Sequence, residues 1–387
     1  MQQQIDDAMR DAAAAQTVPG FVALAATDRE TIYQGAFGRS DLSGDAPMTL
    51  EKVFWIASMT KAVVSVAAMQ LVEQGRLSLD DPISKILPAL RQPMVLQGFD
   101  AAGVPQLRPA QRAVTLRHLL THTSGYGYDT WNAELMRVHE HFGTERIPTS
   151  WADVERTVLL FEPGTRWNYG ISTDLAGKLV EAVSGQTLDA YLRDHLLAPL
   201  GMHDTTFLLT DAQRARRARM HARDPDGRLR PIDHAAGDAL TFCLGGGRLC
   251  STGGDYLRFL QMLLGGGSRD GVQILRPETV AEMQRNQIGN LTVSTLRSGV
   301  PDRSNDANLF PGMVQKWGLG FLINTEPGPA GRSAGSLAWA GLGNTYFWID
   351  PARNIAGVLM TQILPFADAG ALEVFSKFER AVYTALA

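Results

Sequence analysis

A serine and a lysine three positions apart could together carry out acyl-transfer chemistry. Ser58 and Lys61 form the only S-x-x-K in the 387 residues. An apolar run, 62–72, follows at once and predicts a buried helix that ends just before Gly75. Because residues i and i+3 share a helix face, we expect the two side chains to lie together at the first turn. A lysine in a dry pocket loses affinity for its proton and could activate the serine hydroxyl. The alternative is a helix-capping serine beside a surface lysine.

A tyrosine further along the chain could complete such a site. Tyr169 lies in the segment 167–170, directly ahead of a helical pattern over 173–183. A phenol beside a lysine ammonium can ionise and relay a proton between nucleophile and leaving group. Taken alone, Tyr169 is better explained as a core or interface tyrosine.

A small-residue strand pattern is the third candidate element. Trp339, Ala340, Gly341 and Leu342 lead into an apolar run that ends at Ile349. Small residues in a strand allow the backbone of a ligand to approach closely. The backbone N–H of Leu342 could supply one oxyanion donor, and the free N–H groups at the start of the helix near Ser58 could supply another. The alternative is an ordinary core strand that contains glycine.

The elements that must position these residues come from both ends of the chain. Residues 3–16 and 254–264 predict helices, and 370–386 predicts a closing helix. Residues 20–26 and 31–37 predict a β-hairpin, and strand patterns recur at 245–249, 317–323, 336–349 and 355–362. Residues 83–225 carry helical patterns, among them 116–121, 151–161, 173–183 and 188–197. We therefore predict an α/β (α+β) fold with an antiparallel sheet flanked by helices. The sheet domain comprises 1–82 and 226–387, the mostly helical domain comprises 83–225, and the site lies in the cleft between them.

Composition excludes several classes of partner. The formal charge is −4, from 36 basic and 40 acidic residues, and no basic stripe forms, so nucleic acid and anionic membrane are not expected partners. No apolar run is long enough to span a bilayer, and the N-terminus has no export-signal pattern. Cys243 and Cys250 have no metal spacing and are expected to be buried free thiols. A cytoplasmic location is expected, and the oligomeric state stays open.

The three candidate elements together resemble the serine β-lactamase and penicillin-binding protein superfamily, whose nucleophile lies in an S-x-x-K motif. The chain most resembles the class C β-lactamase-like esterases called family VIII carboxylesterases. The resemblance spans most of the chain and rests on segments 54–61, 119–125, 199–202, 245–249 and 347–351, which read FWIASMTK, LLTHTSG, PLGM, GGGRL and FWIDP.

The resemblance implies a role for each candidate residue. Ser58 would be the nucleophile, Lys61 its base partner and Tyr169 a second general acid or base. The N–H groups of Ser58 and Leu342 would form the oxyanion hole. The reaction would be hydrolysis of short- to medium-chain carboxylic esters through an acyl-enzyme, with a small-molecule ester as substrate and no metal or organic cofactor. Tyr126 and Tyr128 could line the acyl or alcohol pocket, and core packing is the alternative for both.

Two departures from the β-lactamase pattern favour esters over β-lactams. Ile171 stands where β-lactamases carry the Asn of Y-x-N, and Trp339 stands where they carry the Lys of K-T-G. That lysine would hold the carboxylate of a β-lactam, whereas a tryptophan can pack against an apolar group. A β-lactamase, a D-amino-acid peptidase or an amidase on the same scaffold stays an alternative. So does a penicillin-binding-like sensor that is acylated once without turnover.

A second serine motif is rejected as the nucleophile. Gly331–Gly335 matches G-x-S-x-G around Ser333. That motif needs a strand before the serine, a helix after it and a histidine later in the chain. Here a strand pattern follows, and the last histidine is His234.

Overall fold

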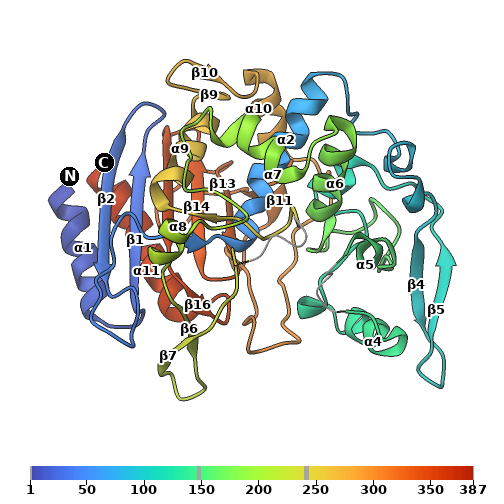
Figure 1. Ribbon diagram of the computed structural model, residues 1–387, viewed down its shortest axis with the longest axis horizontal. Helices are drawn as coiled ribbons and strands as arrows, with labels where there is room; N and C mark the ends of the chain where they lie inside the picture. The colour runs from blue at the N-terminus through green and yellow to red at the C-terminus, as the bar shows by residue number, and fades with distance from the viewer. Residues whose placement is uncertain (1, 146–149, 239–243, 387) are drawn as a thin grey trace.

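The computed structural model describes residues 2–145, 150–238 and 244–386 (Figure 1). Its centre is a seven-stranded sheet in which every neighbouring pair is antiparallel. The predicted fold class, an antiparallel sheet flanked by helices, is confirmed. In spatial order the strands are β11 (Gln315–Trp317), β12 (Leu322–Asn324), β13 (Leu337–Gly341), β14 (Thr345–Asp350), β15 (Ile355–Met360), β1 (Gly20–Ala26) and β2 (Thr31–Gly38).

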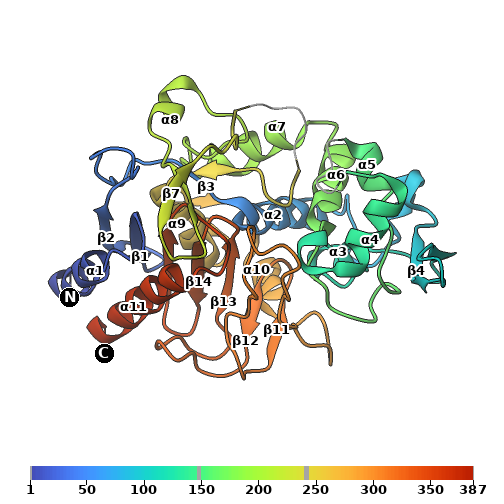
Figure 2. The same cartoon turned by 90° about the horizontal axis from the view of Figure 1, so that it is seen from below.

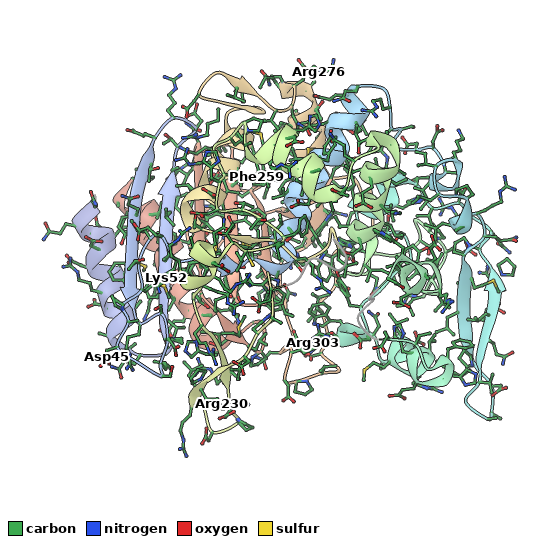
Figure 3. The ribbon with its side chains drawn as sticks, in the orientation of Figure 1. Asp45, Lys52, Arg230, Phe259, Arg276 and Arg303 are labelled. Carbon is green, nitrogen blue, oxygen red and sulfur yellow. The ribbon has the colours of Figure 1, made fainter. Side chains whose placement is uncertain are left out.

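Helices cover both faces of this sheet. On one face α1 (Gln2–Ala14) packs against α11 (Ala369–Ala385), and on the other α9 (Gly253–Leu264) lies across β1 and β15. Successive side chains of β14 alternate between the two faces. The rings of Tyr346 and Phe375 of α11 stack at 4.9 Å between centroids, whereas Phe347 lies 5.5 Å from Tyr256 of α9. Figure 3 shows Phe259 of α9 in the interior of the molecule.

The segment that carries Ser58 runs between the sheet and the helical part of the chain. Helix α2 (Thr60–Glu73) is apolar nearly all round, and 12 of its residues, 60–71, are buried. It packs against α6 (Ser172–Ser184) on the side away from the sheet (Figure 2). The chain turns away from the helix at Gly75, whose φ of +68° is the left-handed conformation that glycine adopts easily.

The stretch 83–225 is mostly helical but contains strands as well. An irregular antiparallel hairpin of β4 (Met94–Phe99) and β5 (Pro105–Pro109) lies at its edge, and β6 (Met220–Arg223) pairs with β7 (Leu229–Ile232) and β16 (Ile363–Leu364). The division of the chain into two domains stays a prediction. The helices of this stretch are α3 (Leu116–Leu120), α4 (Ala133–Phe142), α5 (Trp151–Glu155), α6, α7 (Leu188–Leu192), a π-helical turn (Arg193–Leu197) and α8 (Asp211–Ala215).

The structure corrects three strand predictions. Residues 317–323 do not form one strand, because a turn at 318–321 separates β11 from β12, and Gly320 has a φ of +100°. Residues 336–349 form two strands, β13 and β14, joined by a tight turn with Asn344 at a φ of +60°. Residues 245–247 are a turn that precedes the two-residue strand β8 (Cys250–Ser251), which pairs with β3 (Phe54–Trp55).

No helix in the described part of the chain is long and apolar enough to cross a membrane. The same residues contain no group of three or more His, Cys, Asp or Glu side chains that could hold a metal ion. Cys250 is a buried free thiol, and burial raises its pKa to about 12. Cys243 lies outside the described residues.

Candidate active site

Ser58 lies in a single 3₁₀ turn, Ala57–Met59, immediately before α2. Ala57 has a φ of +43°, a conformation that costs a residue with a side chain about 1–3 kcal/mol and often marks a functional site. The Tyr256 hydroxyl donates to the Met59 carbonyl at 3.0 Å and so anchors this turn from α9. The Ser58 side chain stays partly exposed while its neighbours are buried.

The side chain of Lys61 is buried beside Ser58, and this placement rules out the surface-lysine alternative. Its Nζ lies 3.2 Å from Ser58 Oγ, 3.1 Å from Tyr128 Oη and 2.5 Å from the carbonyl oxygen of Gly246. The residue is 1% exposed. Three oxygen atoms therefore surround the amine, and one of them is the predicted nucleophile.

Tyr169 is buried next to the same amine, but its hydroxyl faces elsewhere. The centre of the Tyr169 ring lies 4.8 Å from Lys61 Nζ. Its Oη accepts a hydrogen bond from Trp339 Nε1 at 3.0 Å. The structure thus brings Tyr169 together with both Lys61 and the predicted Trp339 strand.

The predicted strand residues Trp339, Ala340 and Gly341 are the buried end of β13, and Leu342 begins the turn that follows. Gly341 lies against the nucleophile turn. A Cβ at this position would meet the carbonyl oxygen of Ile56 at 2.3 Å, so only glycine permits this approach. The strand end therefore borders the segment that carries Ser58, as an oxyanion donor at Leu342 requires.

The two tyrosines after the 119–125 loop have different environments. Tyr126 is fully buried, burial raises its pKa, and its hydroxyl has no hydrogen-bond partner among the described residues. Core packing thus describes Tyr126. Tyr128 is only partly buried, and its hydroxyl contacts Lys61. Desolvation, and next the charge of Asp174, raise the pKa of Tyr128 well above its usual range, while Arg303 (Figure 3) opposes that rise.

Two residues that complete the surroundings of Lys61, Asp174 and Gly246, were not predicted to contact it. Asp174, in the first turn of α6, accepts a hydrogen bond from the Gly246 N–H at 2.7 Å. Burial raises the pKa of Asp174 to about 6, and the charges of Lys61 and Arg248 oppose that rise. An acid in the first turn of a predicted helix and a Gly-Gly-Gly turn were both visible in the sequence. Their contact, across 72 positions, was not.

His122 supports the site from within the 119–125 loop. Its φ is +55°, and its carbonyl accepts a hydrogen bond from the N–H of Asn168 at 2.9 Å, which ties the loop to the Tyr169 segment. Its ring lies 4.7 Å from the Tyr169 ring. Burial, and next the charge of Lys61, hold the pKa of His122 well below its usual range. It is therefore a neutral packing group at physiological pH.

An apolar hollow opens beside Trp339. It lies under the loop between α10 (Pro277–Gln284) and β11. Because Trp339 forms part of its wall and contacts Tyr169, the hollow adjoins the catalytic candidates. The apolar lining residues are Trp167, Val293, Leu296, Ala307, Leu309, Leu322, Trp339 and Phe366.

Ser333 has none of these surroundings. It lies in the loop before β13, and its backbone N–H donates to the carboxylate of Asp350 at 2.8 Å. No helix follows it, since the chain enters β13 at Leu337. The nucleophile-elbow motif at 331–335 is therefore a coincidence of sequence.

Comparisons with known proteins cover most of the chain. A sequence model described as Beta-lactamase matches residues 5–376. The chain is 32% identical over 400 residues to monacolin J acid methylbutanoyltransferase of Aspergillus terreus, covering 98% of this chain and 95% of the relative. It is 32% identical over 359 residues to lovastatin esterase of Penicillium rubens, covering 88% of each chain.

Among solved structures, the LovD6 mutant of simvastatin synthase from Aspergillus terreus superimposes with a TM-score of 0.85 and 31% identity. The match covers 98% of this chain and 96% of that one. The chain is therefore an enzyme of the beta-lactamase family, within the superfamily of serine β-lactamases and penicillin-binding proteins.

Proposed function

We propose that the chain is a serine carboxylesterase that hydrolyses short- to medium-chain esters through an acyl-enzyme on Ser58. The observation that carries the proposal is the distance of 3.2 Å between Lys61 Nζ and the partly exposed Ser58 Oγ, with the amine itself buried. A serine hydroxyl needs a neighbouring base to become a nucleophile, and an amine shielded from water can take that role.

The other two oxygens around Lys61 orient the amine for this task. A neutral amine has two N–H donors and one lone pair. The carbonyl of Gly246 lies at 2.5 Å and can only accept, so it takes one N–H group. We assign the second N–H group to Tyr128 Oη, which lies at 3.1 Å, beside Ser58 Oγ at 3.2 Å. The lone pair is then directed at the hydroxyl proton of Ser58.

In the acylation step the Ser58 oxygen bonds to the ester carbonyl carbon while its proton passes to Lys61 Nζ. The negative charge that develops on the carbonyl oxygen is met by the backbone N–H groups of Ser58 and Leu342. The bond from the carbonyl carbon to the alcohol oxygen then breaks. In deacylation a water oxygen attacks the same carbon, and the Ser58 oxygen leaves with a proton.

Tyr169 is proposed to give its proton to the leaving alcohol and to regain one from the attacking water in deacylation. Its ring lies against the amine, and its oxygen accepts the N–H of Trp339. A hydrogen bond donated to a phenol oxygen stabilises negative charge on that oxygen, so Tyr169 can give up its proton and regain it.

The residues around the site favour a neutral ester over a β-lactam. Trp339 fills the position of the β-lactamase K-T-G lysine, and its face forms part of the apolar hollow. Ile171, in place of the Y-x-N asparagine, is buried at the start of α6. Neither side chain can pair with a carboxylate, whereas both can contact an apolar acyl or alcohol group.

A second candidate function is acyl transfer from an ester donor to an alcohol acceptor. The relatives' names favour it, because one is a methylbutanoyltransferase and another an esterase at the same 32% identity. Both reactions pass through the same acyl-enzyme and differ only in whether water or an alcohol attacks it.

The test is turnover of p-nitrophenyl butyrate by the native chain and by Ser58→Ala, with and without a primary alcohol as acceptor. The proposal requires p-nitrophenol release that the substitution abolishes. Butyrate as the main product supports the esterase, and a butyrate ester of the added alcohol as the main product supports the transferase. Release that persists in Ser58→Ala would refute both.

A further inference from the structure

Asp174 contacts the opposite side of the residue that binds Lys61. Its Oδ1 accepts the N–H of Gly246 at 2.7 Å, and the carbonyl of Gly246 accepts from Lys61 Nζ at 2.5 Å. One glycine therefore links a buried carboxylate to the amine beside the nucleophile. The proposed acyl-transfer steps do not involve this carboxylate.

The packing around Gly246 keeps this link short. A Cβ on Gly246 would lie 2.8 Å from both carboxylate oxygens of Asp174 and 2.9 Å from Tyr128 Oη. Contacts this short force atoms to shift, so a side chain here would separate the turn from Asp174 or from Tyr128. The carboxylate thus determines where the Gly246 carbonyl lies and, through it, where Lys61 Nζ lies.

The charge of Asp174 is also close to Lys61. Asp174 is 2% exposed, and burial raises its pKa to about 6. The charged and titratable groups that act on it are Lys61 on α2, Arg248 after the glycine turn and Tyr128 on the loop after α3. Above about pH 6 Asp174 is therefore an anion, although anions are costly to bury.

We propose that Asp174 is the positioning residue of the lysine base. Its carboxylate holds the Gly246 N–H, so that the Gly246 carbonyl stays in contact with Lys61 Nζ. Its negative charge stabilises the ammonium that Lys61 becomes when it takes the Ser58 proton. The O–H bond of Ser58 breaks, an N–H bond forms on Lys61, and Asp174 keeps its own protonation state throughout. The carboxylate of a Ser-His-Asp triad stabilises the protonated base in the same way. This inference rests on the proposed acyl transfer at Ser58.

A purely structural role makes a different prediction. An acidic residue in the first turn of a helix stabilises the helix through its dipole. If Asp174 served only α6, its removal would lower stability and leave the pH dependence of Ser58 reactivity unchanged. The pH dependence therefore separates the two roles.

The experiment measures the rate at which a fluorophosphonate labels Ser58, by intact-protein mass spectrometry, from about pH 5 to about pH 9. The variants are Asp174→Asn, which keeps an acceptor for Gly246 without the charge, and Asp174→Ala, which keeps neither. Asp255→Asn is the matched control, because Asp255 is a buried acid in the first turn of α9 whose pKa burial also raises.

The native labelling rate should rise through the titration of Asp174 near pH 6. Asp174→Asn should lack this rise and label roughly 10- to 100-fold more slowly at pH 8, as loss of an outer partner of a reactive group commonly does. Asp174→Ala should be at least as slow, and Asp255→Asn should match the native rate. Asp174→Asn with the native rate and profile would overturn the inference, and so would equal slowing in Asp255→Asn.

The fluorophosphonate needs no ester turnover, which separates this inference from the proposed function. Labelling that depends on Asp174 in a chain that hydrolyses no ester would uphold the inference and refute the esterase. Ester turnover with labelling that ignores Asp174 would do the reverse. A native chain in which Ser58 is never labelled would overturn both.

Discussion

The phenol oxygen that contacts Lys61 Nζ belongs to Tyr128, at 3.1 Å. The ring of Tyr169 packs against the same amine, and its hydroxyl oxygen accepts a hydrogen bond from Trp339. In the proposed mechanism the two tyrosines have separable tasks, with Tyr128 orienting the base and Tyr169 handling the proton of the leaving group. From the sequence, Tyr128 was only a candidate pocket residue.

Removing each hydroxyl should separate these tasks. Tyr169→Phe should lower kcat for p-nitrophenyl butyrate by about 100-fold or more, as loss of a general acid or base does. Tyr128→Phe should cost about 10- to 100-fold, the value of one hydrogen bond to a charged group, because Lys61 becomes an ammonium when it takes the Ser58 proton. Tyr126→Phe is the control and should be close to native, because the Tyr126 hydroxyl has no partner among the described residues. A larger loss in Tyr128→Phe than in Tyr169→Phe would reverse the assignment.

The Trp339 indole should act through Tyr169. Trp339→Phe keeps an aromatic ring against the hollow and removes the N–H that Tyr169 accepts. We expect kcat to fall about 3- to 10-fold, which corresponds to one neutral hydrogen bond, with little change in KM. Trp348→Phe is the control, because it removes a comparable hydrogen bond, from Trp348 Nε1 to the Tyr383 hydroxyl, in the core beside α11. This variant should keep the native kcat. An equal kcat in Trp339→Phe and the native chain would show that the hydrogen bond from Trp339 to Tyr169 does not contribute to catalysis.

Asp174 should also make stability depend on pH. Its pKa is raised from the ordinary 3.8 to about 6 on folding. Asp174 therefore lowers the free energy of unfolding as the pH rises from 3.8 to about 6, and the loss of stability persists above about pH 6. The penalty has an upper limit of about 3 kcal/mol. Asp174→Asn should therefore melt at a higher temperature than the native chain at pH 8 and at the same temperature at pH 4. A variant that melts lower at pH 8 would contradict the raised pKa.

The turn at Gly246 should not accept a side chain. In Gly246→Ala the new Cβ would collide with the Asp174 carboxylate and Tyr128 Oη, which should displace the Gly246 carbonyl from Lys61. We expect ester turnover to fall at least about 10-fold and stability to fall by about 1–3 kcal/mol. Gly254→Ala, in the first turn of α9 with open space around it, should keep native turnover and gain about 0.4–1 kcal/mol. Native turnover in Gly246→Ala would show that the position of the Gly246 carbonyl does not control the activity of Lys61.

Short-range patterns were enough to predict much of this molecule. The apolar run after Ser58 predicted α2, and the i, i+3 spacing placed Lys61 beside Ser58, as the distance of 3.2 Å shows. The hairpin of β1 and β2, the helices α1, α9 and α11, and the antiparallel sheet followed from periodicity and from strand patterns at both chain ends.

The errors arose where distant segments decide the local structure. The strand predicted over 317–323 is interrupted by the turn at 318–321, where the chain passes close to Met283. A Cβ on Gly318 would lie 2.2 Å from the Met283 carbonyl oxygen. Gly245–Gly247 has a composition that fits a strand, but it packs as a turn against Asp174 and Tyr128. A single sequence shows neither contact. The same limit hid Asp174, whose partner is 72 residues away.

The most direct test of the central claim is paired kinetics on p-nitrophenyl butyrate and a chromogenic cephalosporin, for the native chain, Ser58→Ala and Ser333→Ala. We expect ester turnover well above cephalosporin turnover in the native chain. Ser58→Ala should lose roughly a thousandfold or more of the ester turnover, and Ser333→Ala should lose none. Dominant cephalosporin turnover would contradict the role given to Trp339, and ester turnover that survives in Ser58→Ala would contradict the nucleophile itself.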